Sequence, residues 1–421
     1  MKKKLKIIFP NAAYLNNNYG VQGLTLPLVD YLNIFFDCEF TYYVAPEHVD
    51  NDLAFVREFD FKVLPTPKSL VAFSRYSKLA YAILFLGRML KRRKAITDSE
   101  RITLDNYIKN IKEGDVIIDA AGLEFIGSVS LTRKWNNFLN YYLAQYVAKK
   151  EDILYIKYTK SYGPLNGPLF KYCVKKLLNN LPFIFVRGET NFGIIKALKI
   201  KPPLYCFPDT SILLKPESPS WAKEYLKKMS LDLSEPIIGI SPSSVIREIT
   251  QITNEDSYHE RLVVRLIEHF SSQGRQVLII PHSIDKRHKQ NCDLEFSKSI
   301  YNKLKTKKNV YLLPEPLTYQ EARSIVGLLD FYVTGRYHGL ASALSMATPV
   351  VVLSWHIKYK DLLSLFYDDY LAVDSRKKGT ESDLESVIKY EENREWHKKE
   401  KVLANKRRVV GEINIGLEIL K

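Results

Sequence analysis

Residues 331–360 read FYVTGRYHGLASALSMATPVVVLSWHIKYK, and this stretch decides the fold. An apolar, β-branched run ends at Thr334, a loop of glycine and polar residues follows, and a series of small residues leads into a second apolar run at 348–355. A strand, a loop, a helix and another buried strand in this order are typical of a parallel sheet connected by helices. The segment therefore predicts one part of an α/β domain.

Similar apolar runs occur on both sides of a central segment rich in Pro and Ser, residues 207–223. They lie at 6–9, 38–45, 115–122, 152–158 and 183–187 in the first half, and at 236–242, 276–282, 310–314, 331–335 and 348–355 in the second. This alternation predicts an α/β protein with two doubly wound Rossmann-like domains that face each other across a cleft. We expect an N-terminal domain over 1–210, a C-terminal domain over 211–390 and a helical segment over 391–421.

The composition narrows the classes of partner. Lys and Arg total 62 against 47 Asp and Glu, a formal charge of +15, which favours an anionic partner or simply reflects a lysine-rich solvated surface. We find no RNA-binding signature and expect no nucleic-acid partner. The four cysteines form no CxxC pair and no metal cluster is visible, so reduced thiols, a cytoplasmic location and no metal are expected.

Residues 69–94, SLVAFSRYSKLAYAILFLGRMLKRRK, leave two interpretations open. Charged residues interrupt the apolar run, so it is too short to span a bilayer. It could lie in the interface at the inner face of the cell membrane, with its basic end near anionic head groups, which would make the protein peripheral there. It could equally be an amphipathic core helix whose basic end suits the helix dipole.

The loop from Gly335 to Gly339 has the composition of an anion site. Free backbone N–H groups at the start of the following helix attract negative charge, and glycine lets the chain approach a ligand closely. Arg336 adds a planar fork for a carboxylate or phosphate, and His338 could exchange a proton near neutral pH. A loop arginine paired with an aspartate beside a packed histidine is the plain structural interpretation of the same residues.

This segment, followed by HIKYK, resembles the C-terminal signature of the polysaccharide pyruvyl transferase family. Further stretches match that family in the same order: NNNYGVQGL at 16–24, DAAGLEF at 119–125, KSYGPLNGP at 160–168, FVRGETN at 185–191, PDTSILL at 208–214, GISPSS at 239–244 and PHSIDKRHKQNCD at 281–293. The resemblance implies a fold similar to GT-B glycosyltransferases and transfer of pyruvate from phosphoenolpyruvate to sugar hydroxyls, usually as a ketal. It implies no cofactor besides this donor substrate, and a glycan or a lipid-linked sugar as acceptor.

The resemblance implies that Arg187, Arg336 and His338 are ligands of the donor. We expect His338 as the acid, with Glu124 and Asp119 preferred as the base over Asp209 and His282, because they lie in the acceptor-side domain; Asp209 also suits a turn cap. The expected donor-binding residues are Arg187, Arg336, Tyr337, His282 and Lys358. The expected acceptor-binding residues are Asn17, Tyr19 and Ser161.

Two other function classes fit the same sequence. A GT-B-type glycosyltransferase could use a nucleotide sugar in the same fold, with Glu315 as a candidate ligand for the ribose. A noncatalytic basic protein could bind nucleic acid or membrane through its charge alone. The loop at 335–339 favours the pyruvyltransferase over the glycosyltransferase.

Overall fold

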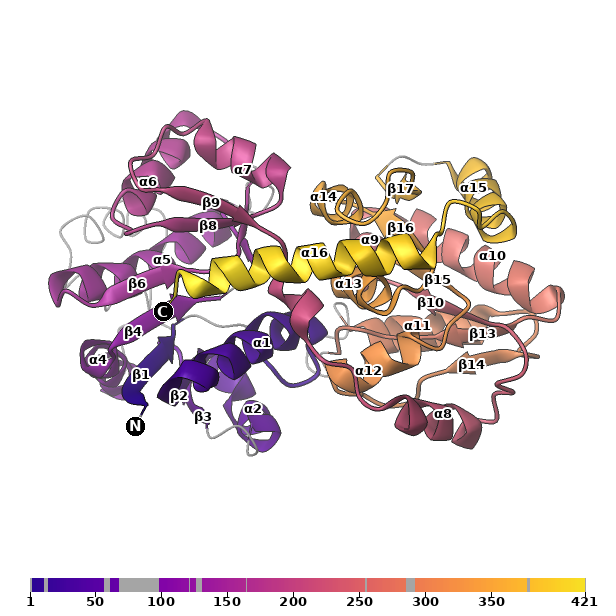
Figure 1. Ribbon diagram of the computed structural model, residues 1–421, viewed down its shortest axis with the longest axis horizontal. Coiled ribbons are helices and arrows are strands. Elements are labelled where there is room, and N and C mark those ends of the chain that lie inside the picture. Colours follow the sequence, from indigo (N-terminus) through magenta and orange to yellow (C-terminus); the bar gives the residue numbers. More distant parts are fainter. Residues whose placement is uncertain are drawn as a thin grey trace. The chain divides into compact units, whose positions relative to one another are not determined.

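A computed structural model describes ten stretches of the chain, residues 2–10, 14–56, 61–67, 98–120, 122–125, 131–163, 165–253, 256–284, 292–376 and 379–420 (Figure 1). Residues 69–94, for which the sequence left two interpretations open, lie outside them. The chain divides into two compact units: unit 1 comprises Met1–Asn16, Leu28–Phe207 and Leu420–Lys421, and unit 2 comprises Asn17–Pro27 and Pro208–Ile419.

These units differ from the expected domains at both ends of the chain. The main break follows Phe207 rather than residue 210, residues 17–27 belong to unit 2, and so does the long C-terminal helix. Packing explains why residues 17–27 belong to unit 2. The Tyr19 ring stacks on that of Tyr319 with centroids 5.6 Å apart, and Gln22 Oε1 accepts a hydrogen bond from Tyr319 N. The C-terminal helix is fixed in unit 2 by Lys406, whose Nζ donates to the Ser345 carbonyl at 2.7 Å.

Unit 1 is built on a five-stranded parallel sheet with the order β3-β2-β1-β4-β6. Its strands are β1 (Lys3–Phe9), β2 (Phe36–Val44), β3 (Phe61–Pro65), β4 (Val116–Asp119) and β6 (Leu154–Lys157), and two short parallel pairs stand beside it, β5 (Leu123–Glu124) with β7 (Ser161–Tyr162) and β8 (Ile184–Arg187) with β9 (Leu204–Phe207). The helices are α2 (Val49–Phe55), α4 (Asp98–Glu113), α5 (Leu131–Lys150), α6 (Pro168–Leu178), α7 (Glu189–Lys196) and the second half of α1 (Tyr19–Phe35), with a 3₁₀ turn η1 (Pro46–His48).

Unit 2 contains a six-stranded parallel sheet with the order β14-β13-β10-β15-β16-β17 (Figure 1). Its strands are β10 (Ile237–Ser241), β13 (Gln276–Ile279), β14 (Val310–Leu312), β15 (Phe331–Thr334), β16 (Val350–Ser354) and β17 (Ala372–Asp374), with a small hairpin of β11 (Gln251–Thr253) and β12 (Asp256–Ser257). The helices are α8 (Pro219–Lys228), α9 (Ser244–Ile249), α10 (Tyr258–Ser272), α11 (Asp293–Lys303), α12 (Tyr319–Val326), α13 (Tyr337–Met346), α14 (Lys358–Leu363), α15 (Thr380–Glu392) and α16 (Lys399–Glu418), with a 3₁₀ turn η4 (Thr210–Leu213).

Both sheets have the strand order of doubly wound folds. With the strands numbered in chain order within each sheet, the order is 3-2-1-4-5 in unit 1 and 3-2-1-4-5-6 in unit 2, and every pair in the two sheets is parallel. In β10, β13, β15 and β16 every residue is buried, so both faces of the sheet are covered. The predicted pair of Rossmann-like domains is confirmed. The order reverses between β1 and β4 and between β10 and β15, which is where ligands bind in such sheets.

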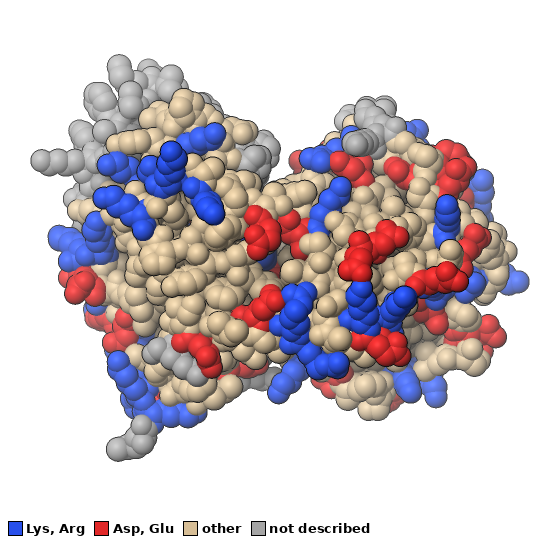
Figure 2. All heavy atoms as spheres, turned by 45° about the horizontal axis from the view of Figure 1, so that its top comes forward, with Lys and Arg blue, Asp and Glu red and all other residues tan. Residues whose placement is uncertain are grey.

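The face of the molecule shown in Figure 2 differs in charge between the two units. In Figure 2 the visible face of unit 2 carries basic and acidic side chains interspersed, whereas part of unit 1 carries a group of Lys and Arg with few acidic neighbours. None of the helices in the described part of the chain is long and apolar enough to cross a membrane.

Candidate active site

The loop at Gly335–His338 lies at the switch point of unit 2, directly after β15. Thr334 Oγ1 accepts a hydrogen bond from Arg336 N at 3.0 Å, and Tyr359 OH donates to the Gly335 carbonyl at 3.0 Å, so the loop is held from both sides. Arg336 is the N-cap residue of α13, and its side chain makes no capping hydrogen bond. The N-terminus of α13 lies where β15 ends, which is the arrangement that an anion site requires.

Arg336 is fixed by an ion pair with Asp293. Its Nη2 contacts Asp293 Oδ1 and donates to Ser244 Oγ at 2.9 Å, and the arginine side chain is 19% exposed while that of Asp293 is fully buried. Asp293 also accepts hydrogen bonds from Ser244 N, Ser244 Oγ and Ser283 N at 2.9–3.0 Å. The carboxylate thus joins the loops that follow β10, β13 and β15, and it orients the guanidinium.

His338 follows on α13 and is partly exposed, whereas its neighbours Tyr337 and Gly339 are buried. Its position depends on Gly20 at the start of α1, because a Cβ there would lie 2.8 Å from His338 Cδ2. Tyr319 OH donates to the His338 carbonyl at 2.8 Å, which anchors the backbone of the same turn. His338, the predicted acid, is therefore held between the first half of α1 and α12, both of which belong to unit 2.

His282 ends a hydrogen-bonded chain whose proton positions can be deduced. Ser241 Oγ donates its single proton to the Ile280 carbonyl at 2.7 Å, so at its 2.5 Å contact with Tyr332 OH it must accept. Tyr332 OH has then used its own proton, and in the 2.7 Å contact with His282 Nε2 the histidine must be the donor. The ring therefore carries its proton on Nε2. His282 Nδ1 is left as an acceptor, and it has no hydrogen-bond partner among the described residues.

Gly339 allows α13 to pass close to this chain. A Cβ at Gly339 would lie 2.5 Å from Thr334 Oγ1, 2.9 Å from Tyr332 OH and 3.1 Å from His282 Nε2. Any larger residue would separate the start of α13 from the end of β13. Gly339, the second glycine of the GRYHG segment, is thus required because a side chain there would meet the hydrogen-bonded chain.

A second buried histidine, His259, has the opposite tautomer. Its Nε2 accepts a hydrogen bond from Ser243 N at 3.0 Å, so the neutral ring carries its proton on Nδ1. Burial lowers the pKa of both His259 and His282 to about 3; the Asp293 carboxylate opposes this shift and the Arg336 guanidinium adds to it. Both rings are therefore neutral at physiological pH.

These two histidines should make the protein sensitive to mild acid. Because the folded-state pKa lies below the unfolded value of about 6.5, their contribution to stability is present above pH 6.5 and is lost as pH falls toward 3. At pH 5 the loss should be about 2 kcal/mol for each ring. His282→Gln keeps an N–H donor for Tyr332 but does not titrate, so it should lose about half as much stability between pH 7.5 and 5. Urea unfolding followed by tryptophan fluorescence measures this; equal losses in both proteins would contradict the assignment.

Three further predicted residues gather around the same loop. The Lys358 ammonium lies 5.1 Å from the centre of the Tyr337 ring, and the Tyr19 ring meets that of His282 edge-on with centroids 5.0 Å apart. Asn17, with a left-handed φ of 60°, accepts a hydrogen bond from Ile284 N at 3.1 Å through its carbonyl. Tyr19 and Asn17 were expected in the acceptor-side domain, and the structure instead places them in unit 2 beside His282.

The other predicted residues come together in unit 1. Arg187, at the end of β8, donates through Nε to Ser161 Oγ at 3.1 Å and through Nη2 to the Gly122 carbonyl at 2.8 Å, and it is 5% exposed. Asp119, at the end of β4, and Glu124, in β5, lie near Arg187. The link is Lys160, because Arg187 N donates to its carbonyl and its ammonium contacts both carboxylates.

Asp119 and Glu124 form a buried quartet with Lys157 and Lys160. Lys157 Nζ lies 2.9 Å from Asp119 Oδ2 and 2.5 Å from Glu124 Oε1, and Lys160 Nζ lies 2.5 Å from Asp119 Oδ1 and 3.4 Å from Glu124 Oε2. Burial raises the pKa of Asp119, but the two ammonium groups outweigh it and hold the pKa below its ordinary value. A catalytic role for Asp119 and Glu124 stays a prediction. Their ion pairs with Lys157 and Lys160 favour a structural role.

Several residues of these two sites were not identified from the sequence. Asp293, Tyr332 and Ser244 support the loop in unit 2, and Lys157 and Lys160 neutralise the carboxylates in unit 1. Asp209 Oδ1 accepts a hydrogen bond from Ser211 N at 2.8 Å and caps η4, which is the alternative that the sequence had left open for it. Among the described residues, no group of three or more His, Cys, Asp or Glu could hold a metal ion.

The fold places the chain in a structural class. Over nearly its whole length it is similar to a UDP-GlcNAc 2-epimerase from Neisseria meningitidis bound to UDP-GlcNAc (TM-score 0.54, 12% identity, covering 97% of this chain and 99% of that one) and to a UDP-GlcNAc 2-epimerase from Methanocaldococcus jannaschii (TM-score 0.54, 12% identity, 96% and 98%). It is also similar to a calicheamicin glycosyltransferase (TM-score 0.51, 11% identity, 98% and 95%). At these identities the likeness shows the fold alone, a GT-B-like pair of Rossmann-like domains.

The family follows from the sequence. The family model for polysaccharide pyruvyl transferase matches residues 34–357. This range covers more than half of the chain, so the protein belongs to the polysaccharide pyruvyl transferase family, as the ordered motifs predicted. A comparison with curated proteins finds no match.

Proposed function

We propose that the protein transfers pyruvate from phosphoenolpyruvate to sugar hydroxyls of a polysaccharide or lipid-linked glycan precursor, as a ketal. The observation that carries this proposal is the Arg336 loop at the switch point of unit 2, in a member of this family. Phosphoenolpyruvate has a carboxylate and a phosphate, and both need cationic or N–H partners. The Arg336 fork, the N-terminus of α13 and the Lys358 ammonium next to Tyr337 supply such groups.

The reaction requires proton transfer in both directions. One sugar hydroxyl adds to C2 of phosphoenolpyruvate while the methylene carbon takes up a proton, and a second hydroxyl of the sugar displaces phosphate at C2. Two C–O bonds form and the C–O bond to phosphate breaks; one hydroxyl proton ends on the new methyl group and the other on phosphate. We assign delivery of the proton to carbon to His338, which is partly exposed at the start of α13.

His282 supports this proposal as a proton acceptor. Its tautomer leaves Nδ1 available, and Gly339 brings the start of α13 within contact of the ring. The low pKa of His282 keeps the ring neutral before substrate binds, and the negative charges of a bound donor would raise that pKa toward neutrality. We therefore assign the base to His282 in preference to Asp119 and Glu124, which are paired with lysines.

Arg187 and Ser161 in unit 1 complete the proposal. The Arg187 guanidinium is oriented by Ser161 Oγ and the Gly122 carbonyl, and its assignment as a donor ligand stays a prediction. We assign the glycan acceptor to unit 1 without specifying its sugars. A lipid-linked acceptor would bring the protein to the inner face of the cell membrane as a peripheral protein.

The direct test is release of inorganic phosphate from phosphoenolpyruvate by the purified protein in the presence of a panel of oligosaccharides and lipid-linked glycans. We expect release that requires both the donor and an acceptor, and that matches the pyruvate found in the glycan. Turnover of a nucleotide sugar in place of phosphoenolpyruvate would instead establish the GT-B glycosyltransferase alternative. Salt-sensitive binding of nucleic acid without turnover would favour the noncatalytic alternative.

Gly20→Ala tests the position of the predicted acid. The added Cβ would meet His338 Cδ2 at 2.8 Å, so the ring must move, and kcat for phosphate release should fall about 10- to 100-fold. The matched control is Gly193→Ala in α7, where a Cβ would meet no atom within 4 Å, and activity there should be unchanged. Wild-type kcat in Gly20→Ala would show that His338 does not act in the reaction.

A further inference from the structure

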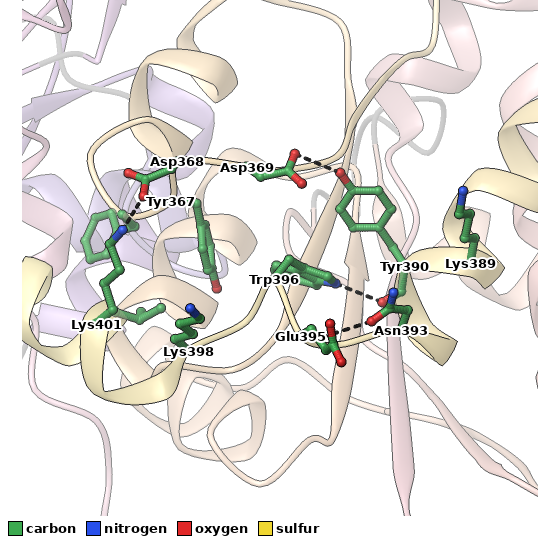
Figure 3. Close-up of a pocket in the computed structure, with 12 residues that line it drawn as sticks. Tyr367, Asp368, Asp369, Lys389, Tyr390, Asn393, Glu395, Trp396, Lys398 and Lys401 are labelled. Atoms are coloured by element: carbon green, nitrogen blue, oxygen red, sulfur yellow. Dashed lines mark hydrogen bonds and ion pairs between the residues drawn. The ribbon is translucent and has the colours of Figure 1, made fainter.

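A cavity of about 580 Å³ lies in unit 2, among the 366–369 loop, the end of α15 and the start of α16 (Figure 3). Its volume is within the range of roughly 300–1,000 Å³ that is usual for ligand sites. All its lining residues follow residue 357, where the match to the family model ends. The cavity therefore belongs to a part of the chain that the family model does not cover.

The cavity is separate from the Arg336 loop. His397 stands next to the lining residues. Its Nε2 donates to the Ala347 carbonyl at 3.1 Å, so in the neutral ring Nδ1 accepts a hydrogen bond from Tyr367 OH at 2.9 Å. Ala347 is the C-cap of α13, whose N-cap is Arg336. A ten-residue helix rises about 15 Å, so the cavity adjoins the opposite end of α13 from the predicted donor site.

Aromatic rings form one part of the lining. In Figure 3 Trp396 lies between Tyr367 and Tyr390, with ring centroids 5.4 Å from each. Trp396 Nε1 donates to the Tyr390 carbonyl at 3.0 Å, and Tyr390 OH donates to Asp369 Oδ1 at 3.1 Å. The rings are thus held in place, and Trp396 and Tyr390 remain partly exposed. Rigid aromatic rings of this kind provide apolar faces with polar edges.

Charged side chains of both signs form another part of the cavity lining. The lining includes three carboxylates, Asp368, Asp369 and Glu395, and three lysines, Lys389, Lys398 and Lys401, so its formal charge is zero. Asp368 and Lys401 pair with each other, and all six side chains belong to exposed residues. A strongly anionic ligand such as a nucleotide would meet the carboxylates, whereas a neutral polyol finds both acceptors and donors.

We infer that this cavity is a glycan-binding subsite that holds one or two neutral sugar rings of a polysaccharide. A pyranose has an apolar face of C–H groups for Trp396 and Tyr390 and a rim of hydroxyls for the carboxylates and lysines. The inference rests on the proposed function only in identifying the polysaccharide as the acceptor chain. Such a subsite would retain a long acceptor while its reacting sugar occupies the active site.

The test is a titration of the full-length protein with neutral gluco-, galacto- and mannotetraoses, followed by the indole N–H resonances in ¹⁵N-labelled protein. We expect a saturable shift of the Trp396 resonance with at least one tetraose. Asp368→Ala, an exposed position that should not affect folding, and Trp396→Leu should each weaken binding about tenfold. Glu385→Ala, exposed on α15 but outside the cavity, is the matched control and should bind as wild type does.

The outcomes separate this inference from the proposed function. Binding that persists in Arg336→Ala, or in a protein that releases no phosphate from phosphoenolpyruvate, would still support the subsite. If no tetraose shifts the Trp396 resonance at millimolar concentration, the inference is wrong, even where short acceptors are pyruvylated. Binding of equal strength in wild type, Asp368→Ala and Trp396→Leu would also overturn it.

Discussion

Arg336→Lys is expected to lower kcat/KM for phosphate release from phosphoenolpyruvate by about 100- to 1,000-fold, the range found when one preorganised charged or hydrogen-bonding partner of the transition state is lost. Lysine keeps the charge but has no planar fork, so it cannot both contact Asp293 and present a second pair of N–H groups to a carboxylate or phosphate. Arg336→Ala should lose at least as much. Steady-state kinetics with saturating acceptor measures the effect.

The structure indicates that these variants will fold. Asp293 keeps three hydrogen bonds, from Ser244 N, Ser244 Oγ and Ser283 N, when the guanidinium is removed. The matched control is Arg376→Lys, whose arginine pairs with Asp374 on the surface with its side chain 61% exposed; it should leave kinetics unchanged. Near wild-type kcat/KM in Arg336→Lys would mean that the loop does not bind the donor through its fork.

Lys157→Met is expected to destabilise unit 1 by about 3–5 kcal/mol, because it leaves two buried carboxylates with one ammonium. The ammonium it removes lies within 3 Å of both Asp119 and Glu124, and the lysine side chain is fully buried. The control Lys112→Met removes an exposed pair with Glu151 and should leave the free energy of unfolding almost unchanged. Urea unfolding monitored by circular dichroism distinguishes the two.

Rescue provides the sharper test of the quartet. Adding Glu124→Gln to Lys157→Met restores charge balance, so the double variant should be more stable than the single one. Because the pKa of Asp119 is held below its ordinary value, its contribution is present above about pH 4 and is lost as pH falls through the folded-state value. A double variant less stable than Lys157→Met would show that the carboxylates are stabilised by something other than the lysines.

The central strands of the unit 2 sheet could be predicted from the sequence because they are buried on both faces. Such strands appear as continuous apolar runs, and each of the ten predicted runs overlaps a strand of the structure. The half-exposed β9 and the short β17 lack that signal. The unit boundaries could not be predicted, since residues 17–27 join unit 2 through contacts such as that of Gln22 with Tyr319, 297 residues away.

The candidate site was partly predictable for a similar reason. Glycine and charged residues directly after a buried strand identified the 335–339 loop, whereas Asp293 resembles an ordinary first-turn aspartate and Tyr332 an ordinary core residue. Only the fold brings them to Arg336 and His282. Lys157 carried a detectable signal, a lysine within an otherwise apolar strand, and a charge there implies a buried partner. That pairing would have suggested a structural role for Asp119 and Glu124 in advance.

The central claim is most directly tested by mass spectrometry of a glycan after incubation with the protein and phosphoenolpyruvate. Ketal formation adds one pyruvic acid less one water to the sugar and releases one phosphate. We predict this mass increment with wild-type protein, its loss in Arg336→Ala, and retention in Arg376→Lys. An unchanged glycan across the acceptor panel, or addition of a sugar from a nucleotide donor, would contradict it.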